Sequence, residues 1–462
     1  MHRKVMGDLI QWKSKERRKP LILRGARQVG KTWLVRDFAK EHFENMIEVN
    51  FDKDPEKSDY FTQPDVDRCL EFLEIESNES VQPGRTLLFL DEIQAAPEVL
   101  ARLRYFHEEK PDLHIVAAGS LLDFLLAEHD FSMPVGRIEY LHLGPMTFEE
   151  FLLARGEKRL QSFLSELGPS DPIPDSIHSR LLERLRVFWV VGGMPLAIKN
   201  YIESGDTRMV AQEHQSLLQT YEDDFAKYEG RVHPHRLRKV FRRLPALIGG
   251  KIKYSKIDPE ERSRDLIQSL DQLEMARVLY RVHHSAGNGV PLGAEADDRD
   301  YKPLFLDIGL VSTSLGLDLV SQSRVEDLLM VNEGTLAEQF IGQHLLYRGP
   351  SYKRPELYYW NRKEKSSSAE VDYLVSIGHK VLPVEVKAGK SGRLKSLQVF
   401  VAEKKVPLAV RFNTRPPKLS SLETAVRTLE NRPFLLLSLP LYLVGELDRM
   451  VRMAFESEID ET

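Results

Sequence analysis

A loop near the N-terminus has the residue types and the spacing that bind phosphate. Residues 25–32 read GARQVGKT and match the pattern G-x-x-x-x-G-K-[ST]. Glycines let the backbone wrap closely around an anion with its N–H groups pointing inward, and a following helix adds partial positive charge. The sequence therefore predicts a nucleotide-binding loop made of Gly25, Ala26, Arg27, Gln28, Val29, Gly30, Lys31 and Thr32.

Two side chains at the end of this loop have separate predicted roles. Lys31 would reach the β- and γ-phosphates of ATP, and the Thr32 hydroxyl would bind Mg²⁺. The apolar run at residues 21–23 is typical of a buried strand, and residues 32–40 can form a helix. This strand–loop–helix context is the one the motif requires, and it argues against a chance match in a glycine turn.

Two acids follow the apolar run TLLFLDE at residues 86–92. By itself such a run is typical of a strand that enters a polar loop. Downstream of a phosphate-binding loop it is the Walker B pattern, and it predicts ATP hydrolysis. Asp91 would hold Mg²⁺ and its water shell, and Glu92 would orient or deprotonate the attacking water.

A second group of acids lies near the C-terminus. Asp372 belongs to the apolar run 370–375, and Glu385 and Lys387 belong to the run 381–387. Since residues i and i+2 of a strand share a face, Glu385 and Lys387 would project together, with Asp372 alongside on a neighbouring strand. Such carboxylates bind Mg²⁺ or Mn²⁺, and the metal would activate water while Lys387 orients it or neutralises developing charge.

The elements expected around these acids are a helix, three strands, a helix and a strand. Their predicted ranges are 333–347, 356–360, 370–375, 381–387, 394–404 and 407–412. This order resembles the PD-(D/E)XK nuclease fold, and the resemblance adds Glu338 to the metal ligands Asp372 and Glu385. Five nearby basic residues suit a phosphodiester substrate or form an ordinary solvated surface: Lys363, Lys365, Lys390, Arg393 and Lys395. A nuclease-like fold can persist after the catalytic activity has been lost, so the fold alone does not predict that this domain cleaves DNA.

A basic stretch occupies the middle of the chain. Residues 231–256 contain nine Lys or Arg and no acid, which favours contact with the phosphate backbone of a polyanion over a solvated charged face. A helix at 259–273 and a hairpin at 275–283 and 301–306 are expected next. Helix, turn, helix and hairpin resemble a winged helix, which is both a DNA-binding form and a protein–protein module.

Length and composition set the frame for these motifs. The chain has 462 residues, 42% of them hydrophobic and 29% charged, and a net charge of -5, so we expect a globular protein of several domains. Cys69 is the single cysteine, which excludes disulfides and multi-cysteine metal sites within the chain. The start of the sequence lacks a signal peptide's apolar core, and the apolar run at 434–444 is too short to span a bilayer. We therefore expect a cytoplasmic protein without membrane contact.

The order of motifs carries a wider resemblance. The runs RGARQVGKT, LLFLDEIQ, AAGSLL, GPMTFEEFL, GGMPLAI, YKPLFLDIGL and LPVEVKAGK are similar to bacterial and archaeal AAA+-like ATPases with a C-terminal domain of unassigned function. The resemblance implies a homo-oligomer, with a hexamer as one candidate form. It makes Ser120 a γ-phosphate sensor and Arg137 an arginine acting on a neighbouring subunit's ATP. The alternatives are a serine that merely ends a strand and a solvated surface arginine. The GGMP turn at 192–195 would touch nucleotide or simply join two helices.

We thus expect an α/β protein with four parts. They are an AAA+-like parallel sheet at 1–150, a helical lid at 151–228, a winged-helix-like basic domain at 229–320 and a restriction-endonuclease-like domain at 330–462. The leading hypothesis is an ATP-hydrolysing protein that couples nucleotide state to a metal-dependent DNA nuclease. The alternative is a nucleotide-dependent switch whose nuclease-like domain binds nucleic acid or a partner without cleaving.

Overall fold

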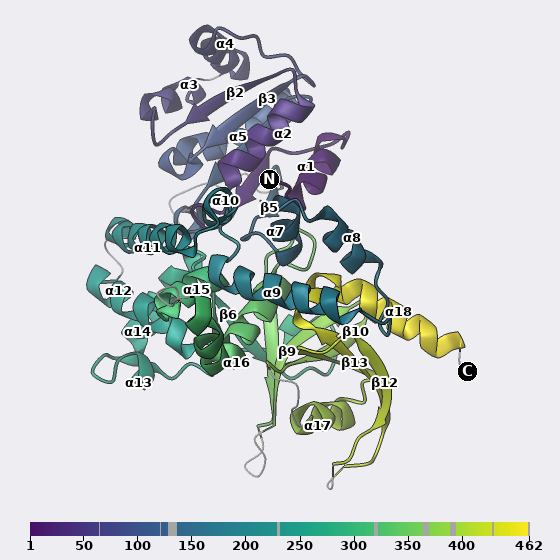
Figure 1. Ribbon diagram of the computed structural model, residues 1–462. Helices are drawn as coiled ribbons and strands as arrows, with labels where there is room; N and C mark the ends of the chain where they lie inside the picture. Colours follow the sequence, from purple (N-terminus) through teal and green to yellow (C-terminus); the bar gives the residue numbers. More distant parts are fainter. Residues whose placement is uncertain are drawn as a thin grey trace. The chain divides into compact units, whose positions relative to one another are not determined.

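The computed structural model separates the chain into two compact units (Figure 1). It describes residues 1–63, 65–120, 122–127, 136–228, 232–317, 322–363, 369–388, 394–426 and 429–460. The first unit comprises Met1–Pro145 with two later segments, Met275–Val278 and Gly349–Pro355. The second unit comprises Met146–Glu274, Leu279–Arg348 and Glu356–Thr462.

The first unit is built on a five-stranded sheet with the strand order β2-β3-β4-β1-β5. Its strands are β1 Leu21–Arg24, β2 Asn45–Asn50, β3 Thr86–Asp91, β4 His114–Gly119 and β5 Glu139–His142. Every neighbouring pair is parallel, which confirms the parallel sheet predicted from the alternation of strands and helices. The register aligns Asn50 with Asp91 and Arg24 with both Gly119 and His142. The carboxyl ends of the strands therefore form one edge.

Apolar residues on both faces of this sheet are buried, as expected where helices cover both sides. Ile22, Leu88 and Ile115 share one core cluster with side chains of α4 and α5. Leu23 and Phe89 are equally buried, and successive strand residues face opposite sides. The helices of the unit are α1 Val5–Lys13, α2 Lys31–His42, α3 Ser58–Phe61, α4 Val66–Ser77, α5 Pro97–Glu109 and α6 Leu122–Ala127, with the short 3-10 helices η1 Pro55–Lys57 and η2 Ile93–Ala95.

The second unit contains an eight-stranded mixed sheet with the order β12-β13-β11-β10-β9-β8-β6-β7. Its strands are β6 Leu279–Ser285, β7 Ala296–Phe305, β8 Leu357–Asn361, β9 Glu370–Ile377, β10 Lys380–Val386, β11 Leu408–Asn413, β12 Lys418–Glu423 and β13 Pro433–Pro440. β9 and β10 are antiparallel, whereas β10 and β11 are parallel because α17 connects them.

Helices fill the first half of the second unit and border its sheet. They are α7 Phe148–Ala154, α8 Lys158–Glu166, α9 Asp175–Val191, α10 Pro195–Ser204, α11 Thr207–Asp224, α12 Pro234–Arg243, α13 Tyr254–Ile257, α14 Ser263–Met275, α15 Ile308–Ser314, α16 Gln322–Leu346, α17 Lys395–Lys404 and α18 Leu447–Asp460; 3-10 helices are η3 Phe225–Tyr228, η4 Leu244–Leu247, η5 Leu292–Glu295 and η7 Leu441–Glu446. The local sequence explains where several of these helices begin or end. Thr147 and Glu150 form a capping box at α7, and Gly205 ends α10 in the left-handed conformation before Asp206 caps α11.

The predicted order of helix, three strands, helix and strand is present as α16, β8, β9, β10, α17 and β11. The predicted hairpin also forms, as β6 and β7. However, β6 pairs in parallel with β8, so the hairpin is the edge of the large sheet. A separate winged-helix module is therefore not confirmed. The β6–β8 pairing joins distant segments, which no local pattern reveals.

Candidate nucleotide site and acidic cluster

The predicted phosphate-binding loop joins β1 to α2 in the first unit. Gln28 and Gly30 have positive φ angles of 63° and 92°, which turn the chain back before α2 begins at Lys31. A Cβ at Gly25 would collide with the backbone oxygen of Leu143, so only glycine fits there. The loop therefore has the tight curvature that an anion-binding loop needs.

Lys31 is buried at the start of α2. Its Nζ donates hydrogen bonds to the backbone oxygens of Gly25 at 3.0 Å and Ala26 at 2.9 Å. Burial lowers the pKa of the Lys31 ammonium to about 8, although Glu92 and Asp91 partly oppose this effect. A phosphate beside Lys31 would supply the negative charge that the buried ammonium lacks.

Thr32 and Asp91 meet as predicted. Thr32 Oγ1 donates to Asp91 Oδ2 at 3.0 Å. Asn50, which sequence reasoning missed, also donates to this oxygen, at 3.3 Å. Burial and the neighbouring Glu92 raise the pKa of Asp91, as expected for a carboxylate placed to receive a cation. Hydroxyl and carboxylate oxygens fit Mg²⁺, so Thr32 and Asp91 suit the metal that ATP brings. The Asn50 side-chain oxygen instead accepts hydrogen bonds from the backbone N–H groups of residues 52–53.

Glu92 lies directly beyond β3 with a left-handed backbone, at φ 51°. Gln94 Nε2 donates to Glu92 Oε2 at 2.6 Å, which holds the carboxylate in one orientation. The sequence analysis did not predict this role of Gln94, although its position in the motif DEIQ was a usable signal.

Ser120, the predicted γ-phosphate sensor, follows the end of β4 and is buried.

Arg137 has a local partner in the first unit. Its Nε donates to Glu108 Oε1 at 2.9 Å, and the side chain is 44% exposed. An exposed pair of this kind contributes little stability. The observed contact matches the alternative of a solvated surface arginine, and action on a neighbouring subunit stays a prediction.

A buried charge cluster lies at the same edge of the sheet and was not predicted. Arg277 Nε donates to Asp123 Oδ2 at 2.6 Å, and Arg24 Nη1 approaches Asp123 Oδ1 at 3.2 Å. Arg277 Nη1 also lies 3.1 Å from His142 Nδ1. Burial raises the pKa of Asp123, but the two guanidinium groups outweigh this and lower it. Arg277 belongs to the segment Met275–Val278, which is distant in sequence from the rest of the first unit, so no local motif predicts its contact with Asp123.

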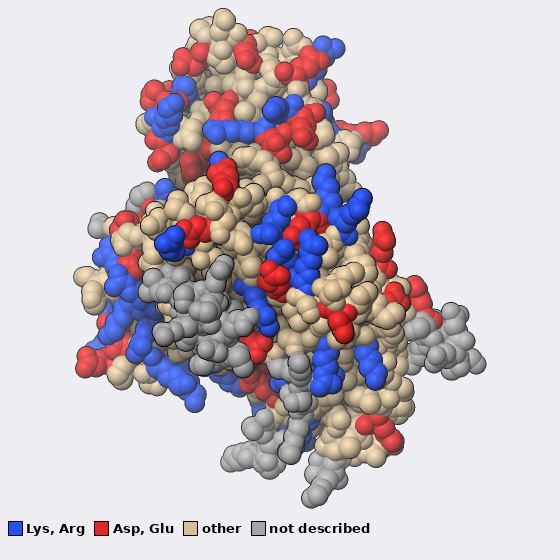
Figure 2. Space-filling model, in the orientation of Figure 1, with Lys and Arg blue, Asp and Glu red and all other residues tan. Residues whose placement is uncertain are grey.

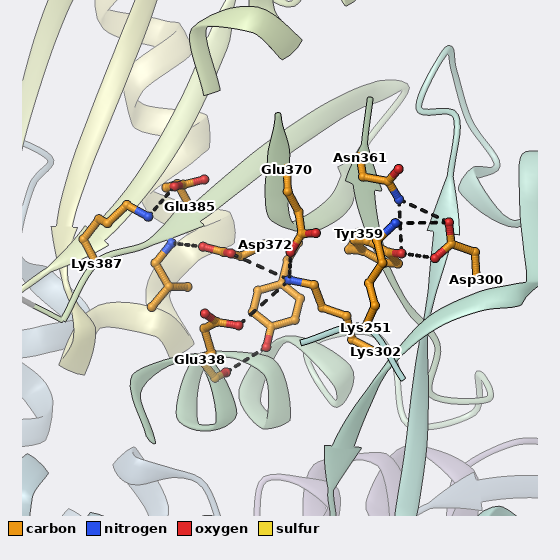
Figure 3. A network of polar contacts seen from close by, with 12 residues as sticks. Lys251, Asp300, Lys302, Glu338, Tyr359, Asn361, Glu370, Asp372, Glu385 and Lys387 are labelled. Carbon is orange, nitrogen blue, oxygen red and sulfur yellow. Dashed lines mark hydrogen bonds and ion pairs between the residues drawn. The ribbon is translucent and has the colours of Figure 1, made fainter. Parts of the chain in front are cut away.

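The acidic cluster of the second unit comprises Glu338, Glu370, Asp372 and Glu385 (Figure 3). Glu338 comes from α16, Glu370 and Asp372 from β9, and Glu385 from β10. Asp372 Oδ2 accepts a hydrogen bond of 2.7 Å from the backbone N–H of Val386, which holds β9 and β10 in register at the cluster. The predicted acids are thus brought together, and Glu370 joins them.

Lys387 pairs with Glu385 as the acid-x-Lys spacing predicts, with Nζ 2.5 Å from Oε1. The other carboxylate oxygen of Glu385 is buried and has no hydrogen-bond partner among the described residues. Burial and Asp372 raise the pKa of Glu385 to about 7, and burial and Asp372 raise that of Glu338 to about 8. The cluster therefore holds more negative charge than its surroundings readily accommodate.

Lys302 of β7 lies among these acids, which sequence reasoning did not foresee (Figure 3). Its Nζ is 2.5 Å from Glu370 Oε1, 3.8 Å from Asp372 Oδ1 and 4.0 Å from Glu338 Oε2. The side chain is only 4% exposed. Burial lowers the pKa of Lys302, but the three carboxylates more than compensate and raise it. Lys302 is thus a buried ammonium ion.

The predicted divalent metal does not fit this arrangement. Within the described ranges, no three His, Cys, Asp or Glu side chains are placed to hold a metal ion. Divalent metals need carboxylate oxygens converging at about 2.0–2.6 Å, and here the carboxylates of Glu338, Glu370 and Asp372 converge on Lys302 instead. The cluster therefore holds an ammonium where the predicted metal would bind.

Comparison with known families separates the chain into three parts. Residues 17–152 match the family described as "AAA domain". Together with the geometry of the loop, Lys31, Thr32 and Asp91, this match assigns the first unit. Residues 17–152 form a P-loop AAA+-like ATPase domain. Residues 182–321 match "Domain of unknown function (DUF8612)", and residues 333–426 match "Domain of unknown function (DUF4143)".

Solved structures also match the chain, at low identity and low TM-score. The Aeropyrum pernix ORC2 protein has 15% identity over 69% of this chain and 94% of its own, with a TM-score of 0.36. The Thermotoga maritima RuvB Holliday junction branch migration motor has 16% identity over 61% of this chain and 90% of its own, with a TM-score of 0.28. The search of curated proteins found no match. The assignment of the AAA domain rests on the family match and the site.

The GGMP turn has an internal partner in the second unit. The Gly193 N–H donates to Asp307 Oδ2 at 2.7 Å, and the same carboxylate caps α15 through the N–H groups of Gly309 and Leu310. Burial raises the pKa of Asp307 to about 6, although these amides oppose the rise. The turn therefore joins α9 to α10 and anchors α15, as in the alternative interpretation of an interhelical turn.

The basic stretch is partly neutralised by acids from other segments. Arg236 contacts Glu261 at 2.9 Å, Arg242 contacts Glu222 at 2.5 Å, and Lys239 pairs with Asp258. The net positive charge around the stretch is therefore smaller than its own sequence indicates. Lys and Arg side chains still gather on the face of the second unit where α12 to α14 lie (Figure 2). Residues 231, 365, 390 and 393 lie outside the described residues.

None of the helices in the described ranges is long and apolar enough to cross a membrane. The apolar run at 434–444 forms β13 and η7 instead, with Leu437 and Leu441 buried in the second unit. Its hydrophobicity thus serves the core of a sheet.

The lowered pKa of Lys31 predicts how ATP affinity of the AAA domain changes with pH. Bound phosphate stabilises the ammonium, so binding is coupled to proton uptake once the free pKa of about 8 is exceeded. We expect constant affinity between about pH 6.5 and 7.5 and a decline approaching tenfold per pH unit above 8. Titration with a fluorescent ATP analogue measures this. Lys31→Arg, which keeps its charge, should bind with a flat profile; an equally flat wild-type profile would contradict the prediction.

Proposed function

We propose that this protein hydrolyses ATP in its AAA domain and couples the nucleotide state to DNA binding by its C-terminal nuclease-like domain. The observation that carries the proposal is the contact of Thr32 with Asp91, made beside the buried Lys31. A hydroxyl, a carboxylate and an ammonium are thereby gathered at one edge of a parallel sheet, which is where α/β proteins bind ligands.

In this proposal, different residues of the AAA domain bind phosphate, hold Mg²⁺ and activate water. Lys31 would exchange the backbone oxygens of Gly25 and Ala26 for phosphate oxygens. Thr32 and Asp91 would hold Mg²⁺, which neutralises phosphate charge when bound. Glu92, oriented by Gln94, would align the attacking water and accept its proton.

The course of the chain supports coupling between the two units. Met275–Val278 and Gly349–Pro355 belong to the first unit, and each leads directly into a strand of the second, β6 or β8. These two strands are parallel neighbours in the large sheet. Arg277 on the first segment binds Asp123 in the AAA domain. β6 begins at Leu279, only two residues after Arg277. We therefore expect a rearrangement at Asp123 to shift the start of β6.

Two forms of coupling remain as hypotheses. In the first, Glu338, Asp372 and Glu385 would hold Mg²⁺ or Mn²⁺ for DNA cleavage. In the second, the domain binds nucleic acid or a partner without cleaving it. The position of Lys302 among the acids supports the second form. Assembly as a homo-oligomer, with Arg137 acting between subunits, belongs to the proposal and draws on the family resemblance.

The experiment that tests this function measures DNA binding and cleavage by the full-length protein. Plasmid, linear and branched DNA are offered with ATP, ADP or no nucleotide, in Mg²⁺ or Mn²⁺. We expect DNA affinity to differ by at least about fivefold between the ATP and ADP states, without cleavage. Lys31→Ala should abolish the difference.

Two variants interpret any cleavage that is seen. Glu385→Ala removes an acid of the cluster, and Glu356→Ala removes an exposed acid just before β8 as a matched control. Cleavage lost only in Glu385→Ala would restore the metal-dependent nuclease hypothesis. Equal DNA affinity in all nucleotide states would contradict coupling.

A further inference from the structure

The acidic cluster already contains a cation that belongs to the protein. Lys302 reaches it from the interior of β7, and its Nζ lies within 4.0 Å of carboxylate oxygens of Glu338, Glu370 and Asp372. The ring of Tyr359 lies 5.2 Å from the same Nζ and adds a further contact that favours positive charge. Three acids and an aromatic face thus surround one ammonium.

The surroundings make this ammonium a fixed part of the fold. Lys302 lies next to Tyr301, which is buried, and the strand pairs with β6 on one side. Withdrawing the side chain would leave the buried Asp372 carboxylate next to the partly exposed Glu370 carboxylate without a compensating charge, which is strongly unfavourable for Asp372. A long, flexible side chain on an exposed loop could leave the site easily, whereas one from a buried strand position cannot.

Lys302 and a divalent metal would use the same acids. Asp372 is bound through Oδ2 by the Val386 N–H, so Oδ1 is the oxygen that can face a cation, and Oδ1 is the atom near Lys302. Glu385 Oε2 is buried and has no hydrogen-bond partner among the described residues, as would suit a ligand whose metal is displaced. The cluster therefore has oxygen donors that could bind a metal. The Lys302 ammonium occupies the position that the metal ion would take.

We propose that Lys302 is a resident cation that takes the place of a divalent metal and closes the acidic cluster to Mg²⁺ and Mn²⁺. The proposal rests on the nuclease-like character of the acidic cluster and deepens the non-cleaving form of the proposed function. It implies that the loss of one positive charge, at residue 302, opens a metal site without the addition of any ligand.

The test measures Mn²⁺ binding to the nucleotide-free full-length protein by electron paramagnetic resonance. Two neutral replacements are compared, Lys302→Met and Lys302→Gln, each with and without Asp372→Asn. We expect both to bind about one Mn²⁺ at least tenfold more tightly than wild type, and Asp372→Asn to remove this gain. The Lys302→Arg protein should bind Mn²⁺ no more tightly than wild type, because arginine keeps the positive charge.

Lys251→Met is the matched control. Lys251 belongs to the same polar network, 3.4 Å from Asp300 Oδ2, and is not among the ion-pair partners of the three acids in the described structure (Figure 3). Its removal should leave Mn²⁺ binding as in wild type. Circular dichroism checks folding of each variant, and Mn²⁺ should raise the melting temperature only of the two neutral variants.

Two outcomes overturn the proposal. One is Mn²⁺ binding by wild type that Asp372→Asn abolishes; the other is folded neutral variants that gain no binding. If neither neutral variant folds, wild type with Fe²⁺ and ascorbate decides, since oxidative chain cleavage near Asp372 would show a metal in the cluster and its absence would uphold the closed site. None of these readouts depends on ATP hydrolysis or DNA, so failure here is distinct from failure of the proposed function.

Discussion

Glu92→Gln is expected to slow ATP hydrolysis by about 10²–10⁴-fold while it leaves ATP binding within about threefold of wild type. The carboxylate stands directly after Asp91 at the end of β3, and Gln94 Nε2 holds its Oε2 at 2.6 Å. Glutamine keeps the size of the side chain and an oxygen that can accept the same hydrogen bond. It loses the ability to take a proton from water.

The hydrogen bonds of the nucleotide-binding loop do not use the Glu92 side chain, whose charge only partly supports the Lys31 ammonium. Lys31 bonds to the loop oxygens, and Thr32 bonds to Asp91, without the Glu92 side chain. Binding and hydrolysis should therefore separate in the variant. Equilibrium titration with labelled ATP and single-turnover phosphate release measure the two steps independently.

Glu98→Gln is a suitable control because Glu98 is an exposed acid in the first turn of α5. It should hydrolyse ATP at the wild-type rate. A Glu92→Gln protein that retains more than about a tenth of wild-type hydrolysis would show that another group accepts the proton, since general bases contribute at least about 10²-fold.

Asp307→Ala is expected to lower the free energy of unfolding of the second unit by about 3–5 kcal/mol. The carboxylate accepts hydrogen bonds from the buried N–H groups of Gly193, Gly309 and Leu310, at 2.7, 2.9 and 3.3 Å. Alanine would leave these donors without an acceptor in a site that water does not reach. Each unsatisfied buried donor costs about 1–3 kcal/mol.

Asp206→Ala provides the comparison. Asp206 also caps a helix, α11, through the N–H of Arg208, but its side chain is 33% exposed. Water can replace that contact, so the expected loss is about 1 kcal/mol. Urea unfolding followed by circular dichroism measures both variants. Similar losses for the two would mean that the link from α15 to the GGMP turn contributes no stability.

The sequence by itself determined the features that lie in contiguous segments. The glycine loop, Lys31 and Thr32 occupy one short stretch, and Asp91 and Glu92 end one apolar run, so pattern and chemistry sufficed to predict them. The parallel sheet followed from the alternation of strands and helices. The spacing of Glu385 and Lys387 likewise predicted their pairing, because a strand places such residues on one face.

The tertiary structure alone decided which distant residues complete each site. Asn50 joins Asp91 because β2 and β3 are neighbours in register, and Arg277 reaches Asp123 from a segment far along the chain. Acids from other elements neutralise much of the basic stretch. Lys302 enters the acidic cluster from β7, a strand of the same sheet that is distant in sequence from β9 and β10. Hydrogen bonds and ion pairs act over a few ångströms of space, whatever the separation in sequence, so the charge of a site depends on the folded chain.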